Sequence, residues 1–342
     1  MATIRDVAKE SGVSVATVSY VLNNGPRPVR AETRERVVST MRRLNYHPNA
    51  VARSLVRQRT HVMGILVGDA QSEIVTNYYY AGILAGVFAG ARLRGYNITF
   101  FTAAATDQGI EHHIRAQRPD AMLVIAPQLG QDLPKRLKSV GIPLGVVGAD
   151  ECYVDSAAVC LDVDNVAGMQ LGMQHLRERG HQPGSIAFAL GDPNQESTRI
   201  RRTVYEQTLR DWGAEPQEQD IIAHSFHSDI VYAAVRERLE LPHPPTAIFA
   251  GNDGIALAAI QAIRDRGRRI PDDVAVIGYD NWPIAAHITP GLTTIQQPMH
   301  DIGEAVVCAL ADRLEENLED KVLSTKSMVK RFMPSLIVRG ST

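Results

Sequence analysis

The sequence predicts a small all-α head, a helix-turn-helix, followed by a larger α/β body with two doubly wound parallel sheets. Three observations support this fold class. Residues 3–23 hold two short helical patterns separated by a tight turn, and from residue 61 onward apolar runs alternate with amphipathic helical stretches. The length of 342 residues suits two or three domains rather than one.

The head begins with Thr3, which can cap a first helix, and Asp6 follows at the spacing of a capping box. Ser11-Gly12 ends that helix and Ser14 caps the next. The apolar positions that share the inner face are Ile4, Val7, Ala8, Val18, Val21 and Leu22. The second helix then presents Val15, Ala16, Thr17, Ser19 and Tyr20 outward. In a helix-turn-helix these side chains meet base edges in the major groove; an ordinary helical hairpin is the alternative.

Charge separates the head from the rest of the chain. Residues 1–60 contain eleven Lys and Arg against four Asp and Glu, whereas the whole chain has 36 basic and 38 acidic residues. A basic head on an acidic body is typical of a DNA-binding module joined to another function, and such binding weakens with salt. Residues 31–44 form a third amphipathic helix, and Pro48 ends the head. The next segment, 49–57, is helical in propensity but only about two turns long, which is marginal in isolation.

The head resembles that of the lactose/galactose repressor (LacI/GalR) family of bacterial transcription regulators. The resemblance lies in Val-Ser-Val-Ala-Thr-Val-Ser-x-Val-Leu-Asn at 13–23, in Arg-Glu-Arg-Val at 34–37 and in Leu-Asn-Tyr-His-Pro-Asn-Ala-Val-Ala-Arg-Ser-Leu at 44–55. It implies a head over 1–48 and a hinge helix and linker over 49–60. It also implies that Leu55 wedges into the minor groove, where the alternative is a linker residue packed on the body. The DNA-binding residues it implies are Thr3, Ser14, Val15, Ala16, Thr17, Ser19, Tyr20, Asn23, Arg27, Tyr46, Asn49, Ala52, Arg53 and Leu55. Tyr20 replaces the usual Arg of the family.

The body has seven predicted strands, at 62–67, 98–101, 122–126, 143–147, 186–189, 247–250 and 274–277. Helical stretches lie between them, at 79–94, 132–140, 164–179, 199–212, 229–239, 254–266 and 299–316. So many alternating elements exceed one sheet, so two lobes are expected. The body resembles the periplasmic-binding-protein-like body of the same family, with chain crossings near 161, 291 and 325. We therefore expect lobe 1 at about 61–160 and 292–324, and lobe 2 at about 161–291 and 325–342.

Ligands of such proteins bind beyond the carboxyl ends of the strands. Asn252 and Asp253 follow one predicted strand, Asp280 follows another, and Arg201 lies near a helix start. A guanidinium facing carboxylates or amides can hold vicinal hydroxyls or a purine edge. For Asp253 we favour capping of helix 254–266 over a ligand role, and Asp280 has the alternative of a turn residue. The resemblance implies that the effector-binding residues are Tyr79, Tyr80, Arg201, Phe226, Asn252 and Asp280.

Other features of the body bear on these assignments. Tyr79 and Tyr80 have the alternative of core residues. The chain departs from the family at Val204, where Gly is usual, and at Gly148, where sugar-binding members often carry Asp. Gly82, Gly86 and Gly90 recur every four residues along one helix face, which suits close helix packing at a subunit interface.

The resemblance implies a dimeric transcription regulator, most often a repressor, that binds double-stranded operator DNA and a sugar, polyol or nucleoside-like effector. The alternative is a solute-binding module without a DNA role. An enzyme is not expected, because the sequence has no nucleophile elbow, phosphate loop or metal-ligand spacing. No cofactor or metal is expected, since Cys152, Cys160 and Cys308 form no cluster. With no signal peptide and no apolar run of membrane-spanning length, we expect a cytoplasmic protein without membrane contact.

Overall fold

A computed structural model describes residues 2–23, 28–46, 59–67, 77–101, 109–128, 133–149, 153, 155–319 and 327–342. The chain divides into two compact units, Met1–His61 and Val62–Thr342. The predicted hinge segment 49–57 lies outside the described residues. Among the described helices, none is both long enough and apolar enough to cross a bilayer.

The first unit contains the three predicted helices, α1 (Ile4–Ser11), α2 (Val15–Asn23) and α3 (Ala31–Arg43). The predicted capping box is confirmed, since the Thr3 side chain accepts from the Asp6 amide and the Asp6 carboxylate accepts from the Thr3 amide. Gly12 then ends α1 with a positive φ of 66°, a conformation that favours glycine. Val7, Val18 and Val37 are fully buried between the three helices. The small core therefore fixes the turn between α1 and α2.

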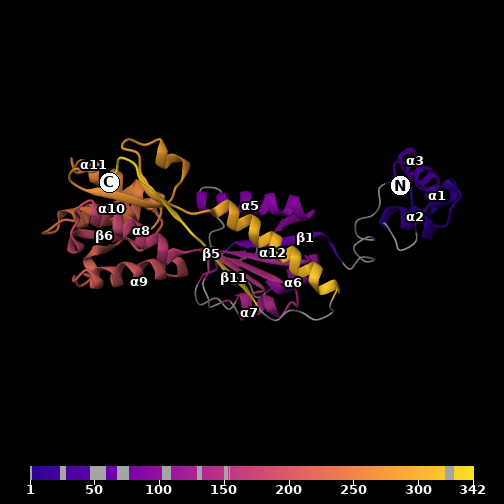
Figure 1. Cartoon of the computed structure of the whole chain (residues 1–342), viewed down its shortest axis with the longest axis horizontal. Helices are drawn as coiled ribbons and strands as arrows, with labels where there is room; N and C mark the ends of the chain where they lie inside the picture. The colour runs from indigo at the N-terminus through magenta and orange to yellow at the C-terminus, as the bar shows by residue number, and fades with distance from the viewer. Residues whose placement is uncertain are drawn as a thin grey trace. The chain divides into compact units, whose positions relative to one another are not determined.

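The second unit contains two six-stranded sheets in the two lobes of Figure 1. The first sheet has the order β11-β5-β4-β3-β1-β2 and is parallel throughout. Its strands are β1 (Val62–Val67), β2 (Asn97–Phe100), β3 (Ala121–Ile125), β4 (Leu144–Val147), β5 (Val159–Val163) and β11 (Met328–Phe332). Helices α5 (Tyr78–Arg94) and α12 (Met299–Glu319) cover one face, while α6 (Ile110–Gln117) and α7 (Leu133–Lys138) contribute to the core of the other.

The second sheet has the order β12-β10-β9-β8-β6-β7, in which only β12 is antiparallel. Its strands are β6 (Ile186–Ala189), β7 (Ile221–Ile222), β8 (Ala247–Ala250), β9 (Ala275–Asp280), β10 (Thr293–Gln296) and β12 (Ser335–Ile337). Helices α8 (Asn165–Glu178) and α9 (Glu196–Asp211) pack on one face, and α10 (Ser228–Glu240) and α11 (Asp253–Asp265) on the other. The fold class predicted from the sequence, a helical head and an α/β body with two sheets, is therefore confirmed.

The chain crosses between the sheets three times, but later than the predicted positions of 161, 291 and 325. β5 belongs to the first sheet through Val163, and β10 belongs to the second through Gln296. β11 pairs with β5, so residues 328–332 lie in the first lobe rather than the second. The sequence predicts no strand at β5, β10 or β11, and the predicted crossings came from the family resemblance, so the strands that end at each crossing were not available to fix its position.

The glycine stripe of α5 does not form a subunit interface as predicted, because it packs against α12 of the same chain. A Cβ on Gly86 would lie 1.9 Å from the carbonyl oxygen of His300, and a Cβ on Gly303 would lie 2.1 Å from that of Ile83. Gly90 faces Glu304 and Val307 in the same way. The two helices therefore approach each other backbone to backbone, which only glycine permits.

Candidate functional site

The outer face of α2 presents small side chains at its amino end. The Ser14 hydroxyl accepts from the Thr17 amide at 3.0 Å and so caps the helix as predicted. Ser14, Val15 and Ala16 are exposed, while Thr17, Ser19 and Tyr20 are half-buried. This face can therefore approach another surface closely, with few strong hydrogen-bonding groups of its own.

The remaining predicted DNA-binding residues lie apart from that face or outside the described region. Thr3 is exposed, but its side chain is engaged in the capping box of α1. Tyr46 is half-buried and packs against the core of the head. Asn23 is the last residue of α2. Arg27, Asn49, Ala52, Arg53 and Leu55 lie outside the described residues.

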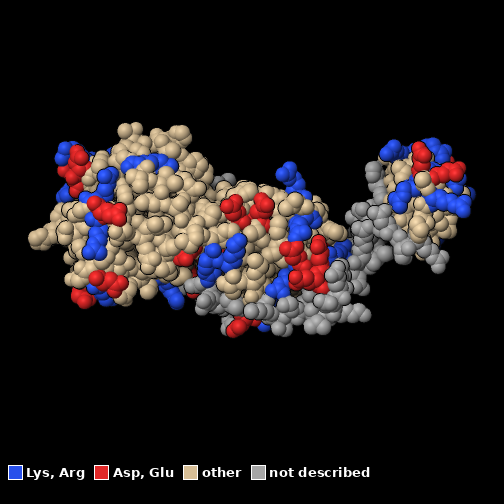
Figure 2. Space-filling view, viewed as in Figure 1, with Lys and Arg blue, Asp and Glu red and all other residues tan. Residues whose placement is uncertain are grey.

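Basic side chains surround the head. Those that the structure describes as exposed within the first unit, up to Arg43, are Arg5, Lys9, Arg30, Arg34, Arg36, Arg42 and Arg43. Figure 2 shows Lys and Arg spread over the visible face of the head, with fewer acidic groups among them. Such a surface attracts a polyanion such as the DNA backbone.

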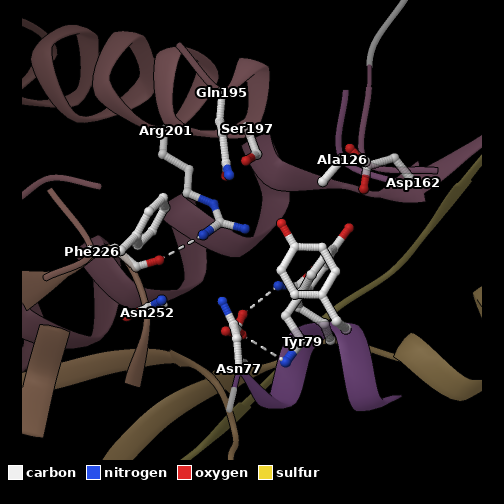
Figure 3. A pocket seen from close by; sticks show the side chains of 14 residues that line it. Asn77, Tyr79, Ala126, Asp162, Gln195, Ser197, Arg201, Phe226 and Asn252 are labelled. Atoms are coloured by element: carbon white, nitrogen blue, oxygen red, sulfur yellow. Dashed lines mark hydrogen bonds between the residues drawn. The ribbon is translucent and has the colours of Figure 1, made fainter. Parts of the chain in front are cut away.

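In the body a pocket of about 540 Å³ of empty space, part of it open to solvent, lies between the two lobes. All six predicted effector-binding residues line it, and Figure 3 shows Arg201 and Phe226 on one side of it and Tyr79 on the other. The other lining residues are Asn77, Ala126, Gly148, Asp162, Gln195, Ser197, Gly251 and Gln297. Many of them directly follow strands, because the parallel strands of each sheet end at the pocket.

Arg201 is held rigidly at the second-lobe side of this pocket. It is only 8% exposed, its Nε donates to Asn165 Oδ1 at 2.9 Å, and its Nη1 donates to the Gly251 carbonyl at 2.7 Å. The guanidinium carbon lies 3.6 Å from the centre of the Tyr279 ring, a close cation–π contact. Nη2 has no protein partner in the described parts of the chain and remains for a ligand.

Two carboxylates face the pocket from opposite lobes. Asp280 ends β9, accepts from the Trp282 indole at 3.0 Å and from the Gln297 amide at 2.5 Å, and has a positive φ of 109°. Asp162 lies inside β5 and accepts from the Val163 amide at 2.8 Å. Burial raises the pKa of Asp280 to about 6 and that of Asp162 to about 7, although Arg201 opposes both shifts. Both groups therefore titrate close to neutral pH, and each can accept or donate a hydrogen bond.

Tyr79 closes the first-lobe side of the pocket above Gly148. A Cβ on Gly148 would lie 2.7 Å from the Tyr79 hydroxyl, and the positive φ of 80° also disfavours any other residue. The aspartate that sugar-binding members often carry at position 148 would therefore displace Tyr79. Burial raises the pKa of Tyr79 well above its usual value, so its hydroxyl stays protonated. Tyr80 is 2% exposed and belongs to the first-lobe core while also lining the pocket.

Asp253 does not cap α11, which corrects the preference derived from the sequence. The cap is Asn252, whose Oδ1 accepts from the Ile255 amide at 2.8 Å and whose Nδ2 has no protein partner in the described chain. The Asp253 carboxylate is fully buried, accepts from the Thr294 hydroxyl and the Trp282 amide at 2.6 Å each, and does not line the pocket.

Sequence reasoning missed four polar pocket residues, Asp162, Gln195, Ser197 and Gln297. One signal was available: Asp162 is a lone carboxylate in the apolar run Val-Cys-Leu-Asp-Val. Gln195 directly precedes α9, Ser197 lies in the first turn of α9, and Gln297 directly follows β10, with no pattern in the sequence that marks them as pocket residues.

Comparisons with known proteins cover both units. The family model described as bacterial regulatory proteins, lacI family, matches residues 3–49, and that described as periplasmic binding protein-like domain matches residues 173–342. The HTH-type transcriptional regulator CelR of Thermobifida fusca is 32% identical over 336 residues, which cover 96% of this chain and 97% of that protein. The ribose operon repressor of Escherichia coli is 30% identical over 346 residues, with 100% of both chains covered.

Solved structures agree. The lac repressor dimer bound to operator and the anti-inducer ONPF superposes with a TM-score of 0.82 at 25% identity, covering 99% of this chain and 98% of that one. The transcriptional regulator CelR–cellobiose complex superposes with a TM-score of 0.75 at 28% identity, with 100% of both chains covered. On these similarities, which extend over the full length of its relatives, the chain belongs to the lacI family of bacterial regulatory proteins.

Proposed function

We propose that this protein is a dimeric transcription repressor whose affinity for operator DNA is set by a small molecule bound between the lobes of its body. The observation that carries this proposal is the union, in one chain, of a basic helix-turn-helix unit and a body whose pocket is lined by polar groups from both lobes. A ligand that contacts both lobes favours one angle between them. It therefore has a differential affinity for two conformations, which allosteric control requires.

The head contacts DNA through the exposed amino end of α2, in the manner of helix-turn-helix proteins. Ser14, Val15 and Ala16 lie where base edges would be read, and the exposed arginines elsewhere in the head supply phosphate contacts. Asn23, Arg27, Tyr46 and the segment with Asn49, Ala52, Arg53 and Leu55 complete this proposed interface. The lac repressor structure, a dimer on its operator, supports the same arrangement.

The pocket suits an uncharged ligand with several hydroxyl groups, such as a sugar, a polyol or a nucleoside. The single guanidinium of Arg201 faces two aspartates, and its Nε and Nη1 are already bonded within the protein. A phosphate would meet Asp162 and Asp280 with little compensating positive charge. Hydroxyl groups can instead bridge Arg201 and the carboxylates, while Phe226 offers an apolar face. The CelR structure contains cellobiose in complex with a related chain.

A regulator of this kind acts without turnover and works in the cytoplasm, where the chromosome lies. The alternative, a solute-binding module without a DNA role, leaves the basic head unexplained. It also conflicts with the transcription regulators and repressors that the chain resembles over its full length.

Two measurements on the full-length protein test the proposal. A footprint on genomic fragments should reveal a near-palindromic site, because a two-fold dimer binds two half-sites. A thermal-shift screen with ribose, glucose, cellobiose, mannitol and adenosine should identify a ligand, since binding at 100 times Kd adds about 2.7 kcal/mol of stability. Arg201→Ala should abolish the shift while leaving the operator footprint in place. Failure to bind any site, with and without these compounds, would refute the repressor assignment.

A further inference from the structure

A single amide side chain connects the charged pocket residues of the two lobes. Asn165 is 4% exposed and is the first residue of α8, directly after the crossing from β5. Its Nδ2 donates to Asp162 Oδ2 at 3.1 Å, and its Oδ1 accepts from Arg201 Nε at 2.9 Å. Both partners line the pocket, but Asn165 itself does not. Figure 3 shows Asp162 and Arg201 on different sides of the pocket.

A side-chain amide suits the chemistry of this contact. Asp162 needs a donor and Arg201 needs an acceptor, and only a side chain with both can satisfy the two at once. Asp162 belongs to the first lobe, through β5, and Arg201 belongs to the second, through α9. A ligand that pulls on either charged group therefore acts on the same buried side chain.

The place of Asn165 in the chain gives this contact a mechanical consequence. Its neighbour Asp164 caps α8 by accepting from the Ala167 amide at 2.8 Å. The backbone amide of Asp164 donates to the carbonyl of Phe332 at 2.8 Å, in the last residue of β11. The crossing after β5 and the crossing after β11 are therefore hydrogen-bonded to each other beside Asn165. A movement of Asn165 would move both of these segments, which connect the two lobes.

We infer that Asn165 is a positioning residue that couples occupation of the pocket to the angle between the lobes. It holds Arg201 and Asp162 in register across the crossing, and ligand contacts with either one are transmitted through its amide to the joined segments. This inference rests on the proposed function, because the lobe angle matters only if it controls the head. Nδ2 also donates to the Val163 carbonyl at 3.5 Å, but the two shorter bonds of Asn165 end on pocket side chains, so its amide does more than satisfy the backbone around it.

Two substitutions separate the roles of the amide. Asn165→Asp keeps an acceptor for Arg201 but places a carboxylate against Asp162 in place of the donor. Asn165→Ala removes all three side-chain hydrogen bonds, those to Asp162 and Arg201 included. Gln170→Ala, at an exposed position of the same helix, is the matched control. Full-length proteins are compared by operator affinity without ligand, by operator affinity with each of ribose, glucose, cellobiose, mannitol and adenosine, and by the affinity for the compound that binds.

Asn165→Asp should change ligand-free operator affinity at least fivefold, although the residue lies in the body. It should also bring the ratio of operator affinities with and without the bound compound close to one, while the affinity for that compound falls less. Typical coupling ratios are about 5 to 150, so the loss is measurable. In Asn165→Ala the ratio of operator affinities with and without the compound should also be close to one, and Gln170→Ala should behave as wild type.

A structural role alone predicts lower thermal stability with an unchanged ratio and unchanged ligand-free operator affinity in Asn165→Asp, and that result would overturn the inference. If Asn165→Ala does not fold, Asn165→Asp decides the matter, because it retains the bond to Arg201. A wild-type protein that binds neither operator nor any of the five compounds would instead defeat the proposed function. The two failures are therefore distinct.

Discussion

At the scale of single residues, the body contains three buried aspartates whose pKa values are raised. Asp162 and Asp280 face the pocket, and Asp253 lies behind it with no exposed surface. Burial raises the pKa of Asp253 to about 8, and the neighbouring charge of Asp280 acts in the same direction. Asp253 therefore keeps its proton at neutral pH and needs no cation beside it, whereas Asp162, with a pKa raised to about 7, is only partly protonated there and Asp280, with a pKa of about 6, is mostly ionised.

Asp253 should make the stability of the protein fall as the pH rises. In the unfolded chain this carboxyl ionises near pH 3.8, whereas in the folded protein it keeps its proton to about pH 8. Between these values the folded state binds more protons, so the free energy of unfolding decreases with pH, by at most about 1.4 kcal/mol per pH unit from this group. Asp253→Asn should abolish that contribution, as urea unfolding between pH 4.5 and 8.5 would show.

The unfolding free energies of wild type and variant should therefore converge or cross as the pH rises. In Asp253→Asn the new amide keeps one acceptor oxygen, for Thr294 or Trp282, and loses the other, so the variant is less stable at pH 4.5. The difference in unfolding free energy between wild type and variant should become smaller toward pH 8.5. Asp229→Asn, at an exposed position of α10, should leave the slope unchanged. A pH slope in Asp253→Asn equal to that of wild type would mean that Asp253 ionises normally in the folded protein.

At the scale of elements, the first lobe depends on the contact of α5 with α12. Gly86→Ala and Gly303→Ala should each destabilise the body by roughly 3 kcal/mol, at the upper end of overpacking, because each new Cβ would meet a backbone carbonyl that cannot rotate away. Gly184→Ala is the matched control, since a Cβ there meets nothing within 4 Å. Denaturant unfolding at two protein concentrations gives the measurement.

The loss should be independent of protein concentration, because the contact lies within one chain. A loss of unfolding free energy that disappeared at high protein concentration would instead indicate that the glycine stripe lies at a subunit interface. A single sequence shows that a helix face is made for close approach, but it does not show which helix approaches.

How far the elements were predictable depends on their burial. The seven strands predicted from apolar runs all form, three of them with the predicted bounds: β1, β6 and β8. Those missed lack such a run. Asp162 interrupts β5, β10 reads Thr-Thr-Ile-Gln, and β11 is an edge strand with exposed Met328 and Val329. β7 has two residues and β12 three. Arg201, Asn252 and Asp280 were predicted from their places near strand ends and a helix start as well as from the family resemblance, and Tyr79, Tyr80 and Phe226 from the resemblance alone. Asp162 lies in β5 and Gln297 directly follows β10, strands that the sequence did not predict.

At the scale of the whole molecule, the body is a pair of lobes that also meet beside the pocket. The rings of Tyr78 on α5 and Trp282 after β9 lie 5.5 Å apart between centroids, tilted by 46°. Gln128 of the first lobe bridges to Gln195 of the second. Trp282 also donates its indole hydrogen to Asp280, a pocket carboxylate. The Trp282 side chain therefore contacts both a pocket carboxylate and the opposite lobe.

Trp282 should therefore report the closure of the lobes. The chain has two tryptophans, and Trp212→Phe leaves Trp282 as the only one. In that background Tyr78→Ala should shift the emission to longer wavelength, because water replaces the tyrosine ring against the indole. A double-mutant cycle of Tyr78→Ala and Trp282→Leu on unfolding should give a coupling of about 0.5–1.5 kcal/mol, as for other aromatic pairs. Tyr232→Ala, remote from Trp282 on α10, is the control. Emission unaffected by Tyr78→Ala, together with a coupling of zero, would mean that the lobes stand apart in solution.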